Sequence, residues 1–189
     1  IGSLLGGSSA LLMTLSPLLK RWLLPVLVIS QAIPVFALAP VLVLWLGYGL
    51  ASKVAMAVLI IFFPVTSSFY YGMQRTERDL LELARIMGAT TPRLFRHIII
   101  PTAIPSLGSG LRVATAVAPI GAVVGESAGS SSGLGYYMLY ANARMQIDNM
   151  FAALAILAIT SLSLYFCIDA LINKLHYWES PKELIHEKT

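Results

Sequence analysis

Long apolar stretches dominate this chain, and two polar segments interrupt them. A membrane-spanning helix needs about 20 mostly apolar residues. Five stretches approach or exceed that length, at residues 1–19, 22–50, 51–71, 101–127 and 150–172. Polar residues gather instead at 72–100 and 128–149. The pattern predicts an all-α polytopic membrane protein with five spans in this chain.

The start of the chain adds one expectation to this pattern. Ile1 is not a methionine, and it opens in the middle of an apolar stretch without the charged region and cleavage site of a signal peptide. We therefore expect that an N-terminal span is missing and that the intact protein has six. With five spans in this chain, Ile1 is expected to begin on the external side.

Composition supports a membrane protein and excludes several other classes. Hydrophobic residues make up 57% of the chain and charged residues 12%, about half the charged share of soluble domains. The formal charge of +4 is scattered between apolar runs rather than gathered on one face, which argues against a nucleic-acid binder. Cys167 is the one cysteine and lies inside an apolar run, so neither a disulfide framework nor a cysteine-based metal site is expected.

Basic residues fix the predicted orientation. If the spans alternate, ten lysines and arginines share one side, and only Lys53 and Arg144 share the other. Such an excess marks the cytoplasmic side. The ten are Lys20, Arg21, Arg75, Arg78, Arg85, Arg93, Arg96, Lys174, Lys182 and Lys188. Residues 72–100 and the tail 174–189 are therefore predicted to be cytoplasmic, and 128–149 external.

The cytoplasmic segment 77–100 has a helical pattern of its own. Acidic residues come early and arginines late, an order that favours the helix dipole. Gly88 and the run Thr90-Thr91-Pro92 then mark a break and a new helix start. Two short helices at an angle are predicted here. Periodicity alone leaves open an amphipathic loop that rests on the lipid headgroups.

The spacing within this segment resembles a known family. Glu82-Leu83-Ala84, then Gly88, then Ile98 and Ile100-Pro101 are similar to the EAA loop of binding-protein-dependent ABC transporter permeases, with mild departures at Leu83 and Ile100. The likeness covers nearly the whole chain. Gln31-Ala32-Ile33-Pro34, Trp45-Leu46-Gly47-Tyr48-Gly49 and the string 129–136 resemble permeases for nitrate, sulfonate, taurine or thiamine-precursor pyrimidines.

The resemblance implies a type I ABC importer transmembrane domain at 1–173, with a coupling loop at 72–100 and a cytoplasmic tail at 174–189. It implies an inner-membrane location, a permease homodimer within the lipid bilayer, an ATPase subunit and an external solute-binding protein. ATP and Mg²⁺ would bind the ATPase, since this chain has no Walker A loop and needs no cofactor. The residues expected to couple to the ATPase are Glu82, Ala84, Arg85, Gly88, Arg93, Leu94 and Pro101.

Three residues of the fourth predicted span are candidates for the translocation path: Arg112, Glu126 and Ser127. Charges at membrane depth usually face a bundle interior or a cavity. Structural roles stay open: Arg112 could bond backbone carbonyls or reach the headgroups, and Glu126 could cap a neighbouring helix. Ser127 also sits in a G-x-S-x-G match, but no strand-to-helix turn surrounds it, so no catalytic residue is predicted.

Two other functions remain as alternatives. A self-sufficient secondary transporter or channel would need an inverted repeat and mid-membrane ion sites; no such repeat is visible, and its cytoplasmic loop would need no helix that docks on a partner. An intramembrane enzyme would need an acid–base pair within the spans, which the sequence does not offer. The substrate is not encoded in these residues, because the resemblance leaves that choice to the binding protein.

Overall fold

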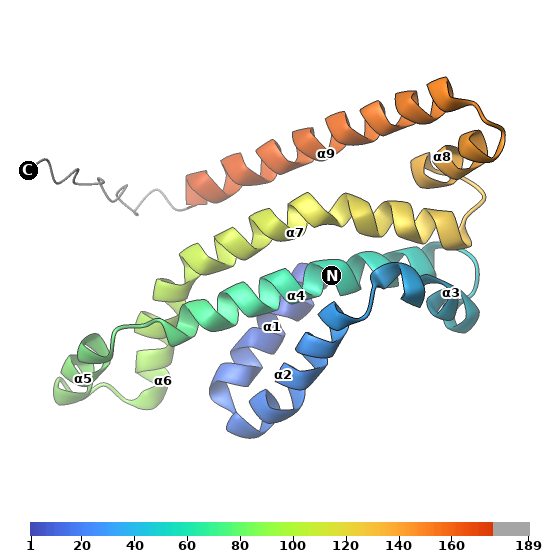
Figure 1. Cartoon of the computed structure of the whole chain (residues 1–189). Coiled ribbons are helices and arrows are strands. Elements are labelled where there is room, and N and C mark those ends of the chain that lie inside the picture. Colours follow the sequence, from blue (N-terminus) through green and yellow to red (C-terminus); the bar gives the residue numbers. More distant parts are fainter. Residues whose placement is uncertain (176–189) are drawn as a thin grey trace, which may run out of the picture.

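The computed structural model describes residues 1–175, and these residues are helical with no strand among them (Figure 1). The predicted all-α class is confirmed for this part of the chain. All but the first two residues of the predicted tail 174–189 lie outside it. The helices are α1 (Gly2–Leu15), α2 (Pro17–Ala32), α3 (Val35–Leu46), α4 (Leu50–Gln74), α5 (Arg78–Ile86), α6 (Thr91–Leu94), α7 (Ile100–Gly129), α8 (Leu134–Ala143) and α9 (Ile147–Leu175).

Three long apolar helices confirm the last three predicted spans. They are α4, the segment Thr91–Gly129, in which a π-helical turn at Phe95–Ile99 joins α6 to α7, and Ile147–Lys174 of α9. The short cytoplasmic helix predicted before Pro101 is therefore the beginning of a span. No break separates it from α7.

The first two predicted spans have different boundaries from those expected. The helix breaks at Ser16, ahead of Pro17, and again at Ile33, ahead of Pro34, because a residue before proline is pushed out of the helical region. Lys20 and Arg21 consequently lie in the first turns of α2 rather than between two spans. α2 and α3 meet at a bend of 107°, so they count as one broken span at most. The described helices therefore supply three or four spans, and the count of five is not confirmed.

Helix α1 runs parallel to α4 and packs on its cytoplasmic half. A Cβ added at Gly2 would lie 3.1 Å from Ile61, and one added at Gly6 would lie 3.0 Å from Val65. Further along, Ala10 and Met13 join a buried cluster with Phe69, Tyr70 and Met73. Gly2 thus lies beside the middle of α4, so α1 does not reach the external end at which Ile1 was expected.

The two ends of the bundle differ in charge and in structure. α5, α6 and the last turns of α4 and α9 lie at one end, whereas α3 and α8 lie at the other (Figure 1). Lys20 also belongs to the first end, where its Nζ lies 5.5 Å from the centroid of the Tyr70 ring. This basic end is the cytoplasmic end by the positive-inside rule, and the other is the external end.

The closest helix pair is α4 with α7, which cross antiparallel through small residues. Ser68 of α4 faces Gly110 of α7, and Gly72 of α4 faces Ser106 of α7. A Cβ at Gly72 would lie 2.5 Å from that of Ser106, so only glycine permits the approach. Small residues are what membrane helices use to bring their backbones together. This α4/α7 interface is the centre of the described fold.

Candidate functional site

Helix α5 projects from the cytoplasmic end as a separate short helix (Figure 1). Asp79 lies in its first turn and Arg85 in its last, as the dipole favours. The helix ends at Met87, and the chain turns at Gly88, which has a φ of +81°. The amide of Ala89 donates to the carbonyl of Ala84 and closes this turn. The predicted break at Gly88 is confirmed.

The role of Gly88 is conformational. A Cβ at this position would meet no atom within 4 Å, so close packing inside the chain does not require glycine. Glycine is instead required by the positive φ, because an L side chain is strained there. The next helix begins at Thr91 with Pro92 in its first turn, as predicted, although the Thr90 side chain makes no capping hydrogen bond.

Most of the predicted coupling residues lie at the surface, and one does not. Glu82, Arg85, Gly88, Arg93 and Pro101 are exposed, and Ala84 is half-buried. Leu94 differs, since it is only 4% exposed. The coupling role of Leu94 stays a prediction. It lies at the end of α6, where the chain enters the bundle, and its side chain packs there.

A set of exposed apolar side chains on α5 was missed by the sequence reasoning. Ile86 is 83% exposed and Met87 is 80% exposed. Leu80 and Leu83 share the segment and are also exposed. Apolar positions three or four residues apart on a polar helix are the signal that could have found them. Together these side chains form an exposed apolar surface at the cytoplasmic end.

Arg112 is held by α9. Its Nε lies 2.5 Å from Oδ1 of Asp169, and its guanidinium also donates to the side-chain oxygen of Asn173. Asn173 in turn donates to the second oxygen of Asp169 at 3.1 Å. The arginine therefore bonds side chains of another span. The sequence signal for this pair was one charge of each sign, Arg112 and Asp169, near the cytoplasmic ends of two consecutive spans.

Glu126 is held by α8. Its carboxylate accepts a 2.8 Å hydrogen bond from the amide of Gly135, in the first turn of that helix. The reading of Glu126 as a helix cap is thus the arrangement seen. A Cβ at Gly133 would lie 2.3 Å from the Glu126 carboxyl carbon, which explains a glycine there. The glycine-serine string is a short connection between α7 and α8, and its Gly133 and Gly135 both contact Glu126.

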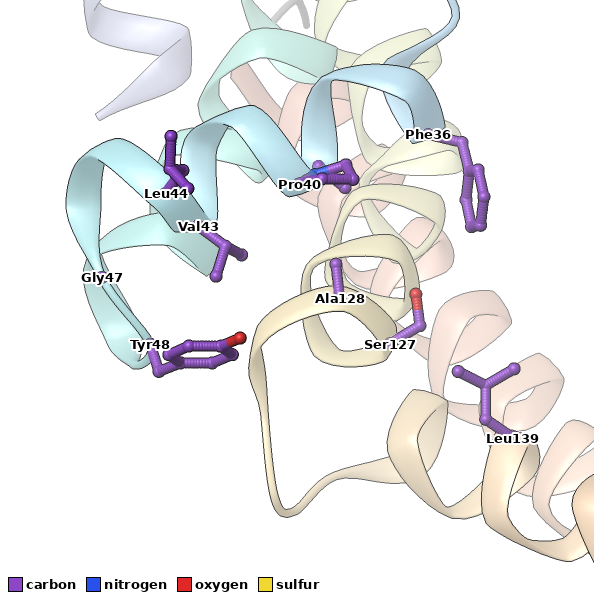
Figure 2. A pocket seen from close by; sticks show the side chains of 10 residues that line it. Phe36, Pro40, Val43, Leu44, Gly47, Tyr48, Ser127, Ala128 and Leu139 are labelled. Atoms are coloured by element: carbon purple, nitrogen blue, oxygen red, sulfur yellow. The ribbon is translucent and has the colours of Figure 1, made fainter.

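Ser127 is the one path candidate that lines a cavity. Its hydroxyl donates to the carbonyl of Val124 inside α7, so the G-x-S-x-G match lies within a continuous helix. Figure 2 shows Ser127 and Ala128 on α7 facing Phe36 and Tyr48 across this external cavity of about 650 Å³. The structure therefore brings Glu126 and Ser127 to the external end, whereas Arg112 lies nearer the other end and faces α9.

Comparison with known proteins agrees with this arrangement. The family model "binding-protein-dependent transport system inner membrane component" matches residues 2–176. A probable ABC transporter permease protein of Haemophilus influenzae is 57% identical over 92% of this chain and 71% of its own length. The formylaminopyrimidine transport permease protein ThiX of Halalkalibacterium halodurans is 42% identical over 92% of this chain and 70% of its own.

A more distant relative is the taurine transport system permease protein TauC of Escherichia coli, 30% identical over 88% of this chain and 60% of its own. The family match extends across all the helices described above. The chain therefore belongs to the family of binding-protein-dependent transport system inner membrane components, and it is a multi-pass inner-membrane permease of an ABC importer rather than an enzyme.

Proposed function

We propose that this chain forms the translocation path of the importer and receives the power stroke of a separate ATPase subunit through residues 78–94. The ATPase binds ATP and Mg²⁺, two copies of the permease enclose the path, and an external binding protein delivers the solute. The observation that carries the proposal is the exposed apolar surface of α5. Ile86 and Met87 are each at least 80% exposed, at the end that the basic residues make cytoplasmic.

The geometry of the segment supports transmission of force from a docked partner. α6 continues through Phe95–Ile99 into α7, so a displacement of residues 91–94 is carried along one helix to the external end. The buried Leu94 fixes this helix start to the bundle. A partner that moves α5 would therefore tilt α7 rather than only bend a loop.

Co-purification of the ATPase tests this proposal. In the full importer extracted in mild detergent, Met87→Asp is expected to lower the recovered ATPase at least 10-fold, because a carboxylate would be desolvated in the docking surface. Met145→Asp is the matched control. Met145 has the same side chain and the same 80% exposure, but it lies after α8 at the external end. Full recovery with Met87→Asp would overturn the proposed coupling surface.

A further inference from the structure

Three cavities follow one another along one side of α7. The external cavity contains Phe36, which also lines a middle cavity of about 480 Å³. The middle cavity contains Phe63, which also lines a cytoplasmic cavity of about 390 Å³. The three therefore adjoin one another from the external end of the bundle to the cytoplasmic end, and together they are called the groove. A phenylalanine lies at each junction.

One face of α7 forms a wall of this groove over its whole length. Its contributions recur every three or four residues, as one face of a helix requires, and they are Ser106, Ser109, Val113, Val117, Ile120, Val124 and Ser127. Arg112 does not line any of the three cavities. Its pairing with Asp169 turns it towards α9, so the groove and the ion pair occupy different faces of α7.

Gln31 is the one polar side chain that lines the middle cavity. It lies in the last turn of α2, just before the bend at Ile33, and faces the middle of α4 around Ile60 and Pro64. The other lining residues are all apolar. Within residues 1–175 the exposed Gln31 amide has no hydrogen-bonding partner. An unpaired amide facing hydrocarbon would be costly, so this position calls for a polar occupant of the groove.

The electrostatics of the groove restrict that occupant. No charged side chain lines the external or the middle cavity. Arg112 is paired with Asp169, and Glu126 accepts from the amide of Gly135. Two other cations lie only at the ends of the groove: Lys53 lines a pocket beyond Tyr48 at the external end, and Arg75 lines the cytoplasmic cavity. An ion in the middle cavity would lose its hydration without a counter-charge, which is far more costly than the same step for a neutral polar molecule.

We propose that the middle cavity is a binding point for the solute in transit, with Gln31 as its hydrogen-bonding residue and an uncharged, planar, unsaturated ring as the solute class. The Gln31 amide offers a donor and an acceptor side by side, which matches a ring with an adjacent acceptor and donor. Phe36 and Phe63 supply aromatic surface at the two ends of the cavity. This inference rests on the proposed function, because it requires a translocation path.

Beyond Phe63 the groove becomes polar. Ser67, Ser68, Ser106 and Ser109 line the cytoplasmic cavity with Tyr71 and Arg75. Hydroxyl groups can replace the hydrogen bonds of water around a neutral solute that leaves the apolar section. A solute that is imported would therefore pass the apolar binding point first and the hydroxyl-lined cytoplasmic cavity second.

Thiol labelling tests the position of Gln31. In a Cys167→Ser background, which removes the exposed native thiol, Gln31→Cys and Ile29→Cys are compared in the reconstituted importer. Ile29 is a matched control, since it is 55% exposed on the same helix two residues away and on the opposite face. A water-soluble maleimide is expected to label Gln31→Cys at least 10-fold faster. Equal rates, or no labelling of Gln31→Cys, would place that position in lipid and overturn the proposal.

Uptake tests the solute class. The reconstituted importer with its ATPase and binding protein is offered formylaminopyrimidine as an uncharged probe and ethanesulfonate as an anion. ATP-driven uptake of the first alone is expected, reduced at least 10-fold by Gln31→Leu and less by Gln31→Asn, which keeps the amide. Uptake of ethanesulfonate, uptake of neither probe, or normal uptake by Gln31→Leu would overturn the class. Failure of the proposed function would instead appear as wild-type protein that recovers no ATPase.

Discussion

The two interfaces of α7 are built on opposite principles. Towards α4 the helix presents glycines and serines, and a side chain added at Gly72 or Gly110 would collide with the opposite helix. Towards α9 it presents one ion pair near the cytoplasmic end, while α8 fills the space at the external end (Figure 1). Only 6% of the apolar window of α9 is buried, against 22% for α4 and for α7.

This difference separates a fixed contact from an adjustable one. The α4/α7 interface depends on shape along its whole length, so its two helices can only move together. α9 is joined to α7 near its two ends: directly by Arg112 with Asp169 at one end, and through α8, whose Gly135 amide bonds Glu126, at the other. Under the proposed function, we expect a stroke that enters through α6 to be carried by α4 and α7 as one body. We expect α9 to be the helix against which that body moves.

Breaking the α4/α7 interface should have the largest effect. Gly110→Leu forces a side chain into the space of Ser68 and the carbonyl of Pro64, where a Cβ alone would be 2.7–2.8 Å from its neighbours. Overpacking of this kind costs about 3 kcal/mol or more when the backbones must separate. The expected result is loss of most of the folded, monodisperse protein in detergent, or a much lower unfolding midpoint.

Gly7→Leu is the control for that variant. Gly7 is also a glycine in a membrane helix, but a Cβ there would meet no atom within 4 Å. Its effect on the unfolding midpoint should be small. Comparable losses for Gly7→Leu and Gly110→Leu would show that any leucine for glycine is harmful and that the α4/α7 interface is not special.

The sequence predicted which kind of residue forms the α4/α7 interface but not which residues of the two helices face each other. The small residues Gly108, Ala114, Ala118 and Gly121 predict close packing of this helix; three of them are buried and Ala118 is half-buried. Nothing in the spacing says that Gly72 and Ser106 face each other. That fact depends on the antiparallel register of α4 and α7, which is set by the turn through residues 75–94 and by long-range packing.

Breaking the ion pair should have an intermediate effect. Arg112→Leu leaves Asp169 without its counter-charge, and we expect destabilisation of about 1–2 kcal/mol, since both side chains are about 30% exposed and polar contacts between membrane helices are modest. The double variant Arg112→Leu/Asp169→Leu should recover much of this loss. A double-mutant cycle on the unfolding free energy measures the coupling, and strictly additive losses would contradict a direct pair.

The sequence revealed Arg112 and Glu126 as unusual but could not name their partners. Asp169 is 57 residues from Arg112, and only the antiparallel placement of α7 and α9 brings them together. The breaks at Ser16 and Ile33 were missed for another reason. Hydropathy continues without interruption through them, although the prolines that follow stop the helix in each case. Composition is enough to predict a membrane protein. Where each helix ends, and how far it extends across the membrane, depends on the backbone geometry at the prolines.

Breaking the cap at the external end should have the smallest effect. Glu126→Ala removes the acceptor for the Gly135 amide, and a lost helix cap costs about 1 kcal/mol. Because α8 also packs on α9 through other residues, the effect should stay local. Hydrogen exchange should quicken in the first turn of α8 and remain unchanged in α4. Glu126→Gln keeps an acceptor oxygen and should exchange like the wild type. If α4 also exchanged faster in Glu126→Ala, the two interfaces of α7 would be coupled, and the division between a fixed and an adjustable contact would fail.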